Sequence, residues 1–468
     1  MGVFIAADDQ TVVVTILPSI IKDFGIRATE LDRASWTITG YLLGYLAVMP
    51  LIGKLSDTWG HRRLFAISTV LFIIGSATVA LAPKMSWLIA ARVFQAIGAG
   101  ALLPISIAIA GDLFPVGKRG IAYGIIGASA EAGGVVGPLW GGLITKFLDW
   151  PWVFWINLPL GVVVLLMLRL MLPSSKGSHT KVDYVGGLLI AAGLTSLTLG
   201  LTRINLPDLP MFLYMVGFTL SLVLFIIWEK NATDPLFPLS TFRNWSFTGA
   251  NTAHLVIGAA LITGMVTIPL MSNTAMGLSP LDGGLRLLRL TAAIPVGAII
   301  GGLACGQFGY RIPAFGGLIL AALGFILMSG WGVNVNEPWL TTHLAITGLG
   351  FGLLIAPITL AATESVGDQD RGAAAATVTA SRMVGMTLGL AALTGWGSGR
   401  FQNLAPATAW PFQLAGETAL ELQKRLLDYD SHLTEAAMTL FKEFFLVAAA
   451  LCVAGLIPCA FIGWRQKR

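Results

Sequence analysis

The feature that most constrains this chain is a succession of apolar stretches, each about 20 residues long. Of the 468 residues, 55% are hydrophobic and only 11% are charged. Soluble domains carry about 25% charged residues, whereas a helix needs about 20 apolar residues to cross a bilayer core of roughly 30 Å. Lipid offers no partners for backbone N–H and C=O groups, so such stretches form membrane-spanning helices. A water-soluble globular fold is excluded.

Fourteen stretches of this kind can be counted along the chain. The first six lie near residues 2–21, 34–53, 64–82, 86–110, 120–143 and 152–171. Two follow near 184–202 and 209–228, and six more near 246–270, 283–305, 313–332, 341–361, 371–396 and 441–463. The pattern predicts an all-α polytopic membrane protein with 14 transmembrane helices. We expect two six-helix bundles, residues 1–171 and 246–468, joined by a linker of residues 172–245 that contains an inserted helix pair.

The basic residues predict the orientation of these helices. The loops after even-numbered spans and the C-terminus carry Lys54, Arg62, Arg63, Lys118, Arg119, Lys176, Lys181, Lys230, Arg243, Arg311, Arg371, Arg465, Lys467 and Arg468. The short loops of opposite parity carry Lys22, Arg27, Arg33, Lys84, Lys146 and Arg203. Because cytoplasmic loops are rich in Lys and Arg, we expect both termini on the cytoplasmic side of the cell (inner) membrane. The charges form no single stripe, so a nucleic-acid partner is not indicated.

The N-terminus and the reactive residue types add little further chemistry. Only Met1 to Ala7 precede the acidic pair Asp8–Asp9, so the first span is barely long enough and a natural start upstream is expected. The three cysteines and five histidines show no metal-ligand spacing, and no phosphate-binding loop or nucleophile motif is present. The sequence therefore indicates no metal, no cofactor and no enzyme.

Three motifs occur in order along the first half of the chain. The loop between the second and third spans contains Gly53, Asp57, Gly60, Arg62 and Arg63, with glycines that permit close approach and an aspartate placed to cap a helix. It resembles motif A of the major facilitator superfamily, although Thr58 and His61 stand where basic residues are usual. Residues 92–100, within the fourth span, are similar to motif B. In that family the buried arginine of this motif, here Arg92, is tied to proton coupling.

The fifth span carries a ridge of small residues. Gly133, Gly137 and Gly141 lie on one helix face, and Pro138 bends the helix. This stretch is similar to motif C of the antiporters of the same superfamily. Residues 9–18 and 152–159 resemble the fourteen-span drug:proton antiporter family, with Val14 where asparagine is usual.

Four shorter stretches, residues 41–45, 100–105, 347–352 and 382–386, resemble the mycobacterial triacylglyceride-exporting branch. The resemblance covers essentially the whole chain. It implies proton-coupled export of lipophilic substrates, either lipids such as triacylglyceride or drugs, by alternating access. It also implies extended outer helix ends and a periplasmic lipoprotein as the lipid carrier. A multidrug efflux antiporter without a lipid role and an uncoupled lipid scramblase remain alternatives.

Charged residues inside the spans are the candidate functional residues. A charge at the bilayer centre costs about 2.5–3.5 kcal/mol, so each one needs a reason. Asp9 and Glu131 are candidate proton sites, and we expect Arg382 to bias which of them holds the proton by approaching Glu131 in one conformation. Arg92 joins this set through the motif B resemblance. A structural lock between opposite charges is the alternative. Asp8 is expected to reach water. Arg286 can snorkel, and Arg289 and Gln95 are cavity candidates.

A segment of about 44 residues separates the last two spans, near residues 397–440. Pro406 and Pro411 predict a turn in its first part. From Glu417 onward, apolar residues recur at near-heptad spacing, at Leu422, Leu426, Tyr429, Leu433, Ala436 and Leu440. Either this part forms an amphipathic helix on the lipid surface, or one helix runs from near Thr418 to Trp464, on the order of 70 Å.

Overall fold

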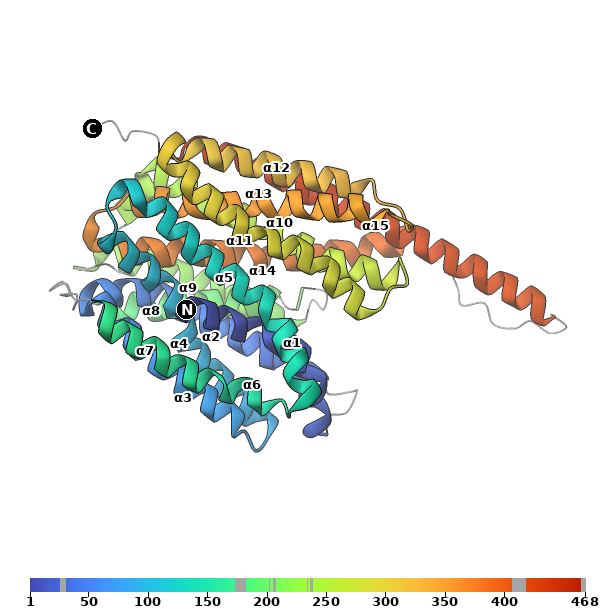
Figure 1. Ribbon diagram of the computed structural model, residues 1–468, viewed down its shortest axis with the longest axis horizontal. Coiled ribbons are helices and arrows are strands. Elements are labelled where there is room, and N and C mark those ends of the chain that lie inside the picture. Colours follow the sequence, from blue (N-terminus) through green and yellow to red (C-terminus); the bar gives the residue numbers. More distant parts are fainter. Residues whose placement is uncertain are drawn as a thin grey trace.

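The computed structural model describes residues 1–25, 31–172, 182–201, 203–204, 208–233, 235, 239–405 and 418–463. Within these ranges the regular structure is entirely helical (Figure 1). The turn predicted around Pro406 and Pro411 and the predicted helix end at Trp464 fall outside the described residues.

The apolar stretches of the first half form seven helices. These are α1 (Gly2–Asp23), α2 (Leu31–Trp59), α3 (His61–Ala80), α4 (Met85–Leu113), α5 (Val116–Phe147), α6 (Pro151–Trp155) and α7 (Asn157–Met171). The short α6 and α7 together occupy the sixth predicted span, and α1 bends by 57° between Val13 and Thr15. The helices of the first half therefore cover the six predicted apolar stretches, with α6 and α7 sharing one of them.

The second half continues the same pattern. Its helices are α8 (Tyr184–Leu201), α9 (Leu209–Asn231), α10 (Trp245–Thr274), α11 (Pro280–Phe308), α12 (Arg311–Ser329), α13 (Glu337–Thr363), α14 (Arg371–Leu404) and α15 (Ala419–Ala460). Two short 3₁₀ turns, η2 (Leu239–Arg243) and η3 (Asp368–Asp370), precede α10 and α14.

Among the described residues, 12 helices are long and apolar enough to cross a membrane, and the bent α1 raises the number to 13. The predicted span near residues 120–143 lies within α5, which is helical throughout but does not reach the same apolar character. Its many glycines and Glu131 lower its mean hydropathy. The chain is thus an all-helical, multi-pass membrane protein.

The helices pack in two groups, each with buried clusters of its own, and a further buried cluster that includes Tyr123 and Leu360 is shared between them. In the N-terminal group, α1 packs on α5, and α4 packs on both α2 and α3. In the C-terminal group, α10 packs on α14 and α15, while α13 packs on α11 and α12. The helices α8 and α9 pack on each other, and α8 also contacts α2. The two groups meet mainly where α5 contacts α11 and where α2 contacts α14.

Close approach of α10 and α14 depends on missing side chains. A Cβ atom at Gly385 of α14 would lie 1.9 Å from the carbonyl oxygen of Leu255, and one at Gly258 of α10 would lie 2.2 Å from that of Arg382. Because these obstacles are backbone atoms, neither helix can yield locally. Small residues therefore set the distance between the two helices, as is usual in membrane proteins.

The helix α15 extends far past the ends of its neighbours, as Figure 1 shows on the right of the view. It begins with a capping box, in which the Thr418 hydroxyl accepts from the Glu421 N–H and the Glu421 carboxylate accepts from the Thr418 N–H. Further along, Glu443 accepts two hydrogen bonds from Arg400 of α14, at 2.6 and 2.8 Å. The segment Ala419–Ala460 is thus one continuous helix of 42 residues.

We expect Gly385→Ala to destabilise the protein by about 1–3 kcal/mol, because the added methyl group forces α10 and α14 apart. Thermal unfolding of the purified protein in detergent measures this loss. Gly399→Ala is the matched control in the same helix, since a Cβ there meets nothing within 4 Å. Equal midpoints for the two variants would contradict the tight packing described here.

Candidate functional site

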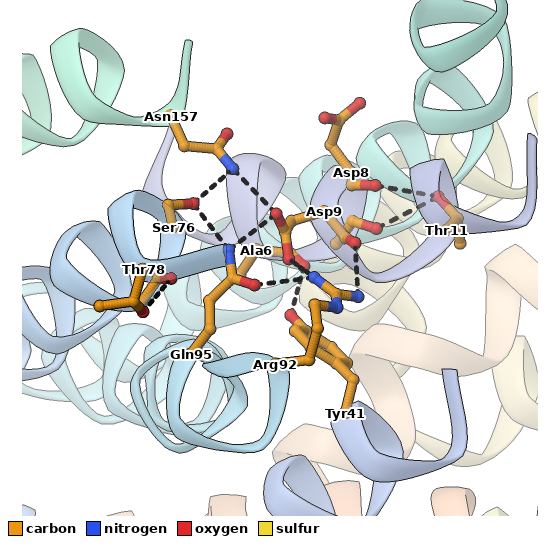
Figure 2. Close-up of polar contacts among 12 residues, drawn as sticks. Ala6, Asp8, Asp9, Thr11, Tyr41, Ser76, Thr78, Arg92, Gln95 and Asn157 are labelled. Carbon is orange, nitrogen blue, oxygen red and sulfur yellow. Dashed lines mark hydrogen bonds and ion pairs between the residues drawn. The ribbon is translucent and has the colours of Figure 1, made fainter. Parts of the chain in front are cut away.

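The most deeply buried polar cluster surrounds Asp9 of α1 (Figure 2). Arg92 of α4 donates to one carboxylate oxygen of Asp9 at 2.5 Å and to its backbone carbonyl at 3.2 Å. The other carboxylate oxygen accepts from the Gln95 amide at 2.9 Å and from the Asn157 amide at 2.8 Å. Both oxygens of the carboxylate are therefore engaged.

A second shell of contacts holds this cluster in place. The Ser76 hydroxyl of α3 accepts from Gln95 at 2.7 Å and from Asn157 at 2.9 Å. The guanidinium of Arg92 lies 4.0 Å from the centre of the Tyr41 ring, and the Tyr41 hydroxyl donates to the Ala6 carbonyl at 3.2 Å. A cation over an aromatic face is stabilised by the ring quadrupole. Five helices thus fix one buried carboxylate.

The glycine ridge of α5 explains why α1 lies close enough to take part. A Cβ at Gly133 would lie 2.2 Å from the Phe4 carbonyl oxygen, and one at Gly137 would lie 2.6 Å from the Asp8 carbonyl oxygen. At Gly141 it would meet the Thr15 hydroxyl at 2.5 Å. The ridge therefore lets the two backbones touch around Asp9, while Pro138 lies inside the same helix.

A second polar cluster joins the two helix groups in the middle of the molecule. Arg382 of α14 forms an ion pair with Glu131 of α5. Both side chains line a cavity of about 140 Å³ together with Tyr45, Tyr123 and His254. The imidazole Nδ1 of His254 lies 2.9 Å from the Val378 carbonyl oxygen. The cavity is lined from both groups, so a change in the Glu131–Arg382 pair affects the contact between them.

The structure separates several residues that the sequence grouped as site candidates. Gln95 turns toward Asp9 instead of the cavity, because the carboxylate and Ser76 satisfy its amide there. Arg289 lies apart from the cavity and pairs with Glu337, as does Arg286. Asp8 was expected to reach water, but its side chain is buried, with 9% of the residue exposed. Its Oδ1 atom has no hydrogen-bond partner within the described part of the chain.

The motif between the second and third spans holds the two groups together at one end. The Asp57 carboxylate accepts from the backbone N–H groups of Gly372 and Ala373, at 3.0 and 3.2 Å, in the first turn of α14. It therefore caps a helix of the other group, where the helix dipole favours a negative charge. Lys54 adds an ion pair with Asp370 at 3.1 Å.

The remaining motif residues have different positions around this contact. A Cβ at Gly53 would lie 2.6 Å from the Ala373 Cα, so glycine permits the close approach. Gly60 has a positive φ of 88° at the turn between α2 and α3. Arg62 donates to the Arg169 carbonyl at 3.2 Å, and Arg63 is exposed.

A further contact between the groups lies at the same end. Arg119 of α5 reaches Glu364 at the end of α13 at 3.8 Å, and Tyr310 donates to the same carboxylate. Beside this ion pair, the backbones of α5 and α11 lie in close contact. Gly120 lies against Gly302, and Gly124 lies against Ala298. The molecule is therefore closed at the α2–α3 end.

Sequence reasoning missed two members of the Asp9 cluster. Asn157 could have been found as a polar residue within an apolar span, whereas Ser76 gives no signal among the other small residues of α3. No group of three or more His, Cys, Asp or Glu side chains within the described ranges could hold a metal ion. The clusters can hold and exchange protons and rearrange ion pairs.

Known proteins resemble this chain along its whole length. Residues 1–401 match the family model described as "Major Facilitator Superfamily". The triacylglyceride transporter of Mycolicibacterium smegmatis is 36% identical over 491 residues, covering 100% of this chain and 87% of that protein. The triacylglyceride transporter of Mycobacterium tuberculosis H37Rv is also 36% identical, covering 100% and 94%.

Two solved structures share the fold. The human organic anion transporter MFSD10 superimposes with a TM-score of 0.61 at 15% identity, covering 96% of this chain and 97% of that one. The proton:xylose symporter XylE gives a TM-score of 0.62 at 13% identity, covering 96% and 92%. At these identities the likeness concerns the fold alone.

We expect Arg92→Met to destabilise the protein by about 3–5 kcal/mol, because it leaves the Asp9 carboxylate buried without its cation. The double variant Asp9→Asn, Arg92→Met removes both charges and should recover a large part of this loss. Thermal unfolding in detergent compares the variants, with exposed Lys424→Met as the control. Independent, additive effects of the two substitutions would contradict a coupled buried pair.

Proposed function

Because this chain belongs to the major facilitator superfamily, and is a transporter and not an enzyme, we propose that it exports lipophilic substrates in exchange for protons. The substrate we favour is a lipid such as triacylglyceride, the cargo named for its relatives in mycobacteria. The observation that carries the proposal is the Glu131–Arg382 pair in a cavity shared by the two helix groups.

The proposed topology follows the sequence prediction. Fourteen helices cross the cell membrane, with α5 and the bent α1 included and with α6 and α7 counted as one span. Residues 1–171 and 246–468 form two six-helix bundles, and α8 and α9 form the inserted pair within residues 172–245. The basic loops place both termini and the α2–α3 end in the cytoplasm.

The proposed coupling uses the difference between paired and unpaired states of Glu131. When Glu131 is ionised, it holds Arg382 and so holds α5 against α14. A proton on Glu131 removes that attraction, and the two helices are then free to separate. A ligand shifts a conformational equilibrium only through different affinities for the two states. The proton binds Glu131 with different affinities in the two states, because Arg382 lies beside Glu131 in one state and is withdrawn from it in the other.

Asp9 is the second proposed proton site, with Arg92 as its cation. Its carboxylate accepts hydrogen bonds from two amides as well as the guanidinium, so protonation rearranges contacts of α1, α3, α4 and α7 together. Alternating access then consists of opening the cytoplasmic end, where Asp57 caps α14, and closing the opposite end.

Drug efflux without a lipid role is the second candidate function. The carboxylate and the aromatic rings in the cavity, from Glu131, Tyr45 and Tyr123, suit an amphipathic cation. An uncoupled scramblase is less well supported, because it needs no carboxylate paired between the helix groups.

In proteoliposomes with an imposed pH gradient, we expect the wild-type protein to accumulate substrate against its concentration gradient. Asp9→Asn and Glu131→Gln should each keep the fold and lower this pH-driven accumulation by roughly tenfold or more, since the differential proton binding is lost. Arg382→Ala should be worse, because it leaves a carboxylate without its cation. A fluorescent triacylglyceride and a cationic dye, assayed in parallel, separate lipid export from drug export.

The matched control is Asp149→Asn, which neutralises an exposed carboxylate in the turn between α5 and α6 and should leave coupling intact. Active accumulation by the double variant Asp9→Asn, Glu131→Gln in response to a proton gradient would refute the proposed coupling. Movement of lipid by the wild-type protein at equal rates with and without the gradient would favour the scramblase.

The projecting part of α15 is the part that precedes Ala436, the first buried residue of this helix. We further propose that this part contacts the lipid substrate or a periplasmic lipoprotein carrier. Leu426→Pro or Leu433→Pro removes a backbone hydrogen bond and clashes with the preceding turn, at about 3 kcal/mol or more. Lipid export should fall while dye export persists. Ala419→Pro is the matched control, because the first helical position tolerates proline. Unchanged lipid export in the two leucine variants would make the extension a passive surface element.

A further inference from the structure

The cytoplasmic-end contact contains a histidine that takes part in neither central cluster. His61 begins α3 and is 7% exposed. Its Nε2 atom lies 3.2 Å from a carboxylate oxygen of Asp112 in α4 and 3.9 Å from one of Asp57 in α2. Its Nδ1 atom lies 2.5 Å from the Ser56 hydroxyl. One imidazole therefore touches two acids, and each of these acids also contacts α14.

The contacts to α14 are made by the same carboxylates. Asp57 accepts from the N–H groups of Gly372 and Ala373, and Asp112 lies 3.5 Å from the guanidinium of Arg371 through its other oxygen. Arg371 also pairs with Asp368 of η3. In the closed state, Asp57 and Asp112 thus have partners on both sides, from α14 and from His61.

The surroundings of His61 allow either charge state of the ring. In the neutral form, Nε2–H donates to Asp112 and Nδ1 accepts from the Ser56 hydroxyl. In the protonated form, both nitrogens donate, and the hydroxyl turns to become an acceptor. Neither form leaves a buried polar atom of the ring unpaired. Histidine is also the side chain type that most often serves as a charge switch in proteins.

The contacts of Asp57 and Asp112 with α14 are called the gate below. We propose that His61 is a proton-binding site that controls the opening of this gate, separate from the central carboxylates. The proposal rests on the proposed alternating access. When α14 withdraws, Asp57 loses the positive end of that helix and Asp112 loses Arg371. Protonated His61 then remains as their cation, held within the N-terminal group.

The sign of the effect follows from the charges around the ring. In the closed state, Arg371, Lys54 and the N-terminus of α14 supply positive potential near His61, opposed by Asp57, Asp112, Asp368 and Asp370. Opening removes the cationic partners of Asp57 and Asp112 and leaves both carboxylates facing the ring. The open state therefore binds the proton more tightly, and acid favours opening. An arginine at position 61 would supply this charge at every pH.

The distance between spin labels on the two groups measures the gate directly. Gly117→Cys and Gly367→Cys provide the label sites, since both glycines are exposed and a Cβ at either meets nothing within 4 Å. The three native cysteines, Cys305, Cys452 and Cys459, are buried and are replaced in this background. Asp9→Asn and Glu131→Gln are included, so that the central carboxylates cannot contribute to the pH response.

From about pH 8 to about pH 5.5, we expect the ratio of long to short distances to rise about tenfold. His61→Gln should give the same ratio of long to short distances at both pH values, because the titratable ring is gone. His61→Arg should be more open than His61→Gln at both. His432→Gln, which alters an exposed histidine of α15, should respond as the parent does.

Asp57→Asn distinguishes this proposal from the proposed transport cycle, because weakening the α14 cap should open the gate at any pH. If Asp57→Asn opens the gate but the parent does not respond to pH, the role of His61 is overturned and alternating access stands. The role of His61 is also overturned if the pH response persists in His61→Gln, or if the gate of the parent closes at acidic pH. If no variant opens, both the gate proposal and alternating access fail.

Discussion

Moving a charge from water into the bilayer core is unfavourable, and this constraint explains where the polar side chains of the helices lie. Asp9 is fully buried, and each of its carboxylate oxygens is held by hydrogen-bond donors from other helices. Glu131 and Arg382 pair across the two helix groups. A buried pair is weak evidence for stability, because desolvation offsets much of the attraction. Its persistence in a transporter is better explained by the states that it distinguishes.

The same constraint makes glycine important in this chain. Without a hydrophobic drive between helices in lipid, association depends on close packing, and polar groups can reach each other only where backbones touch. The ridge of Gly133, Gly137 and Gly141 brings α1 against α5 and so carries Asp9 into its cluster. At the α2–α3 end, Gly53 allows Asp57 to reach the backbone of α14. Small residues thus position the charges.

Sequence reasoning located the helices and the charged residues because both have strong local signals. A 20-residue apolar run predicts a span, and Asp9, Glu131 and Arg382 stand out against it. The pairing of these charges was less accessible. The approach of Arg382 to Glu131 was a hypothesis about two opposite charges in apolar spans, whereas nothing local assigns Arg92 to Asp9, since these partners come from helices far apart in the sequence. Gln95 and Arg289 were grouped with the cavity for the same reason, and only the packing shows that they face elsewhere.

The helix α14 offers a physical route between the central cavity and the gate. It carries Arg382 in the cavity and presents Arg371, Gly372 and Ala373 to the N-terminal group at the α2–α3 end. Arg382 follows Arg371 by eleven positions along this helix, a rise of roughly 16 Å. A continuous helix transmits a displacement over that length with little loss. Release of Arg382 by Glu131 would therefore bear on the caps at Asp57 and Asp112, and a proton at His61 would bear on the same helix from its other end. Coupling of this kind requires an element with two arrangements that both sites bias. The helix α14 contacts both sites, and the proposed alternating access supplies its second arrangement.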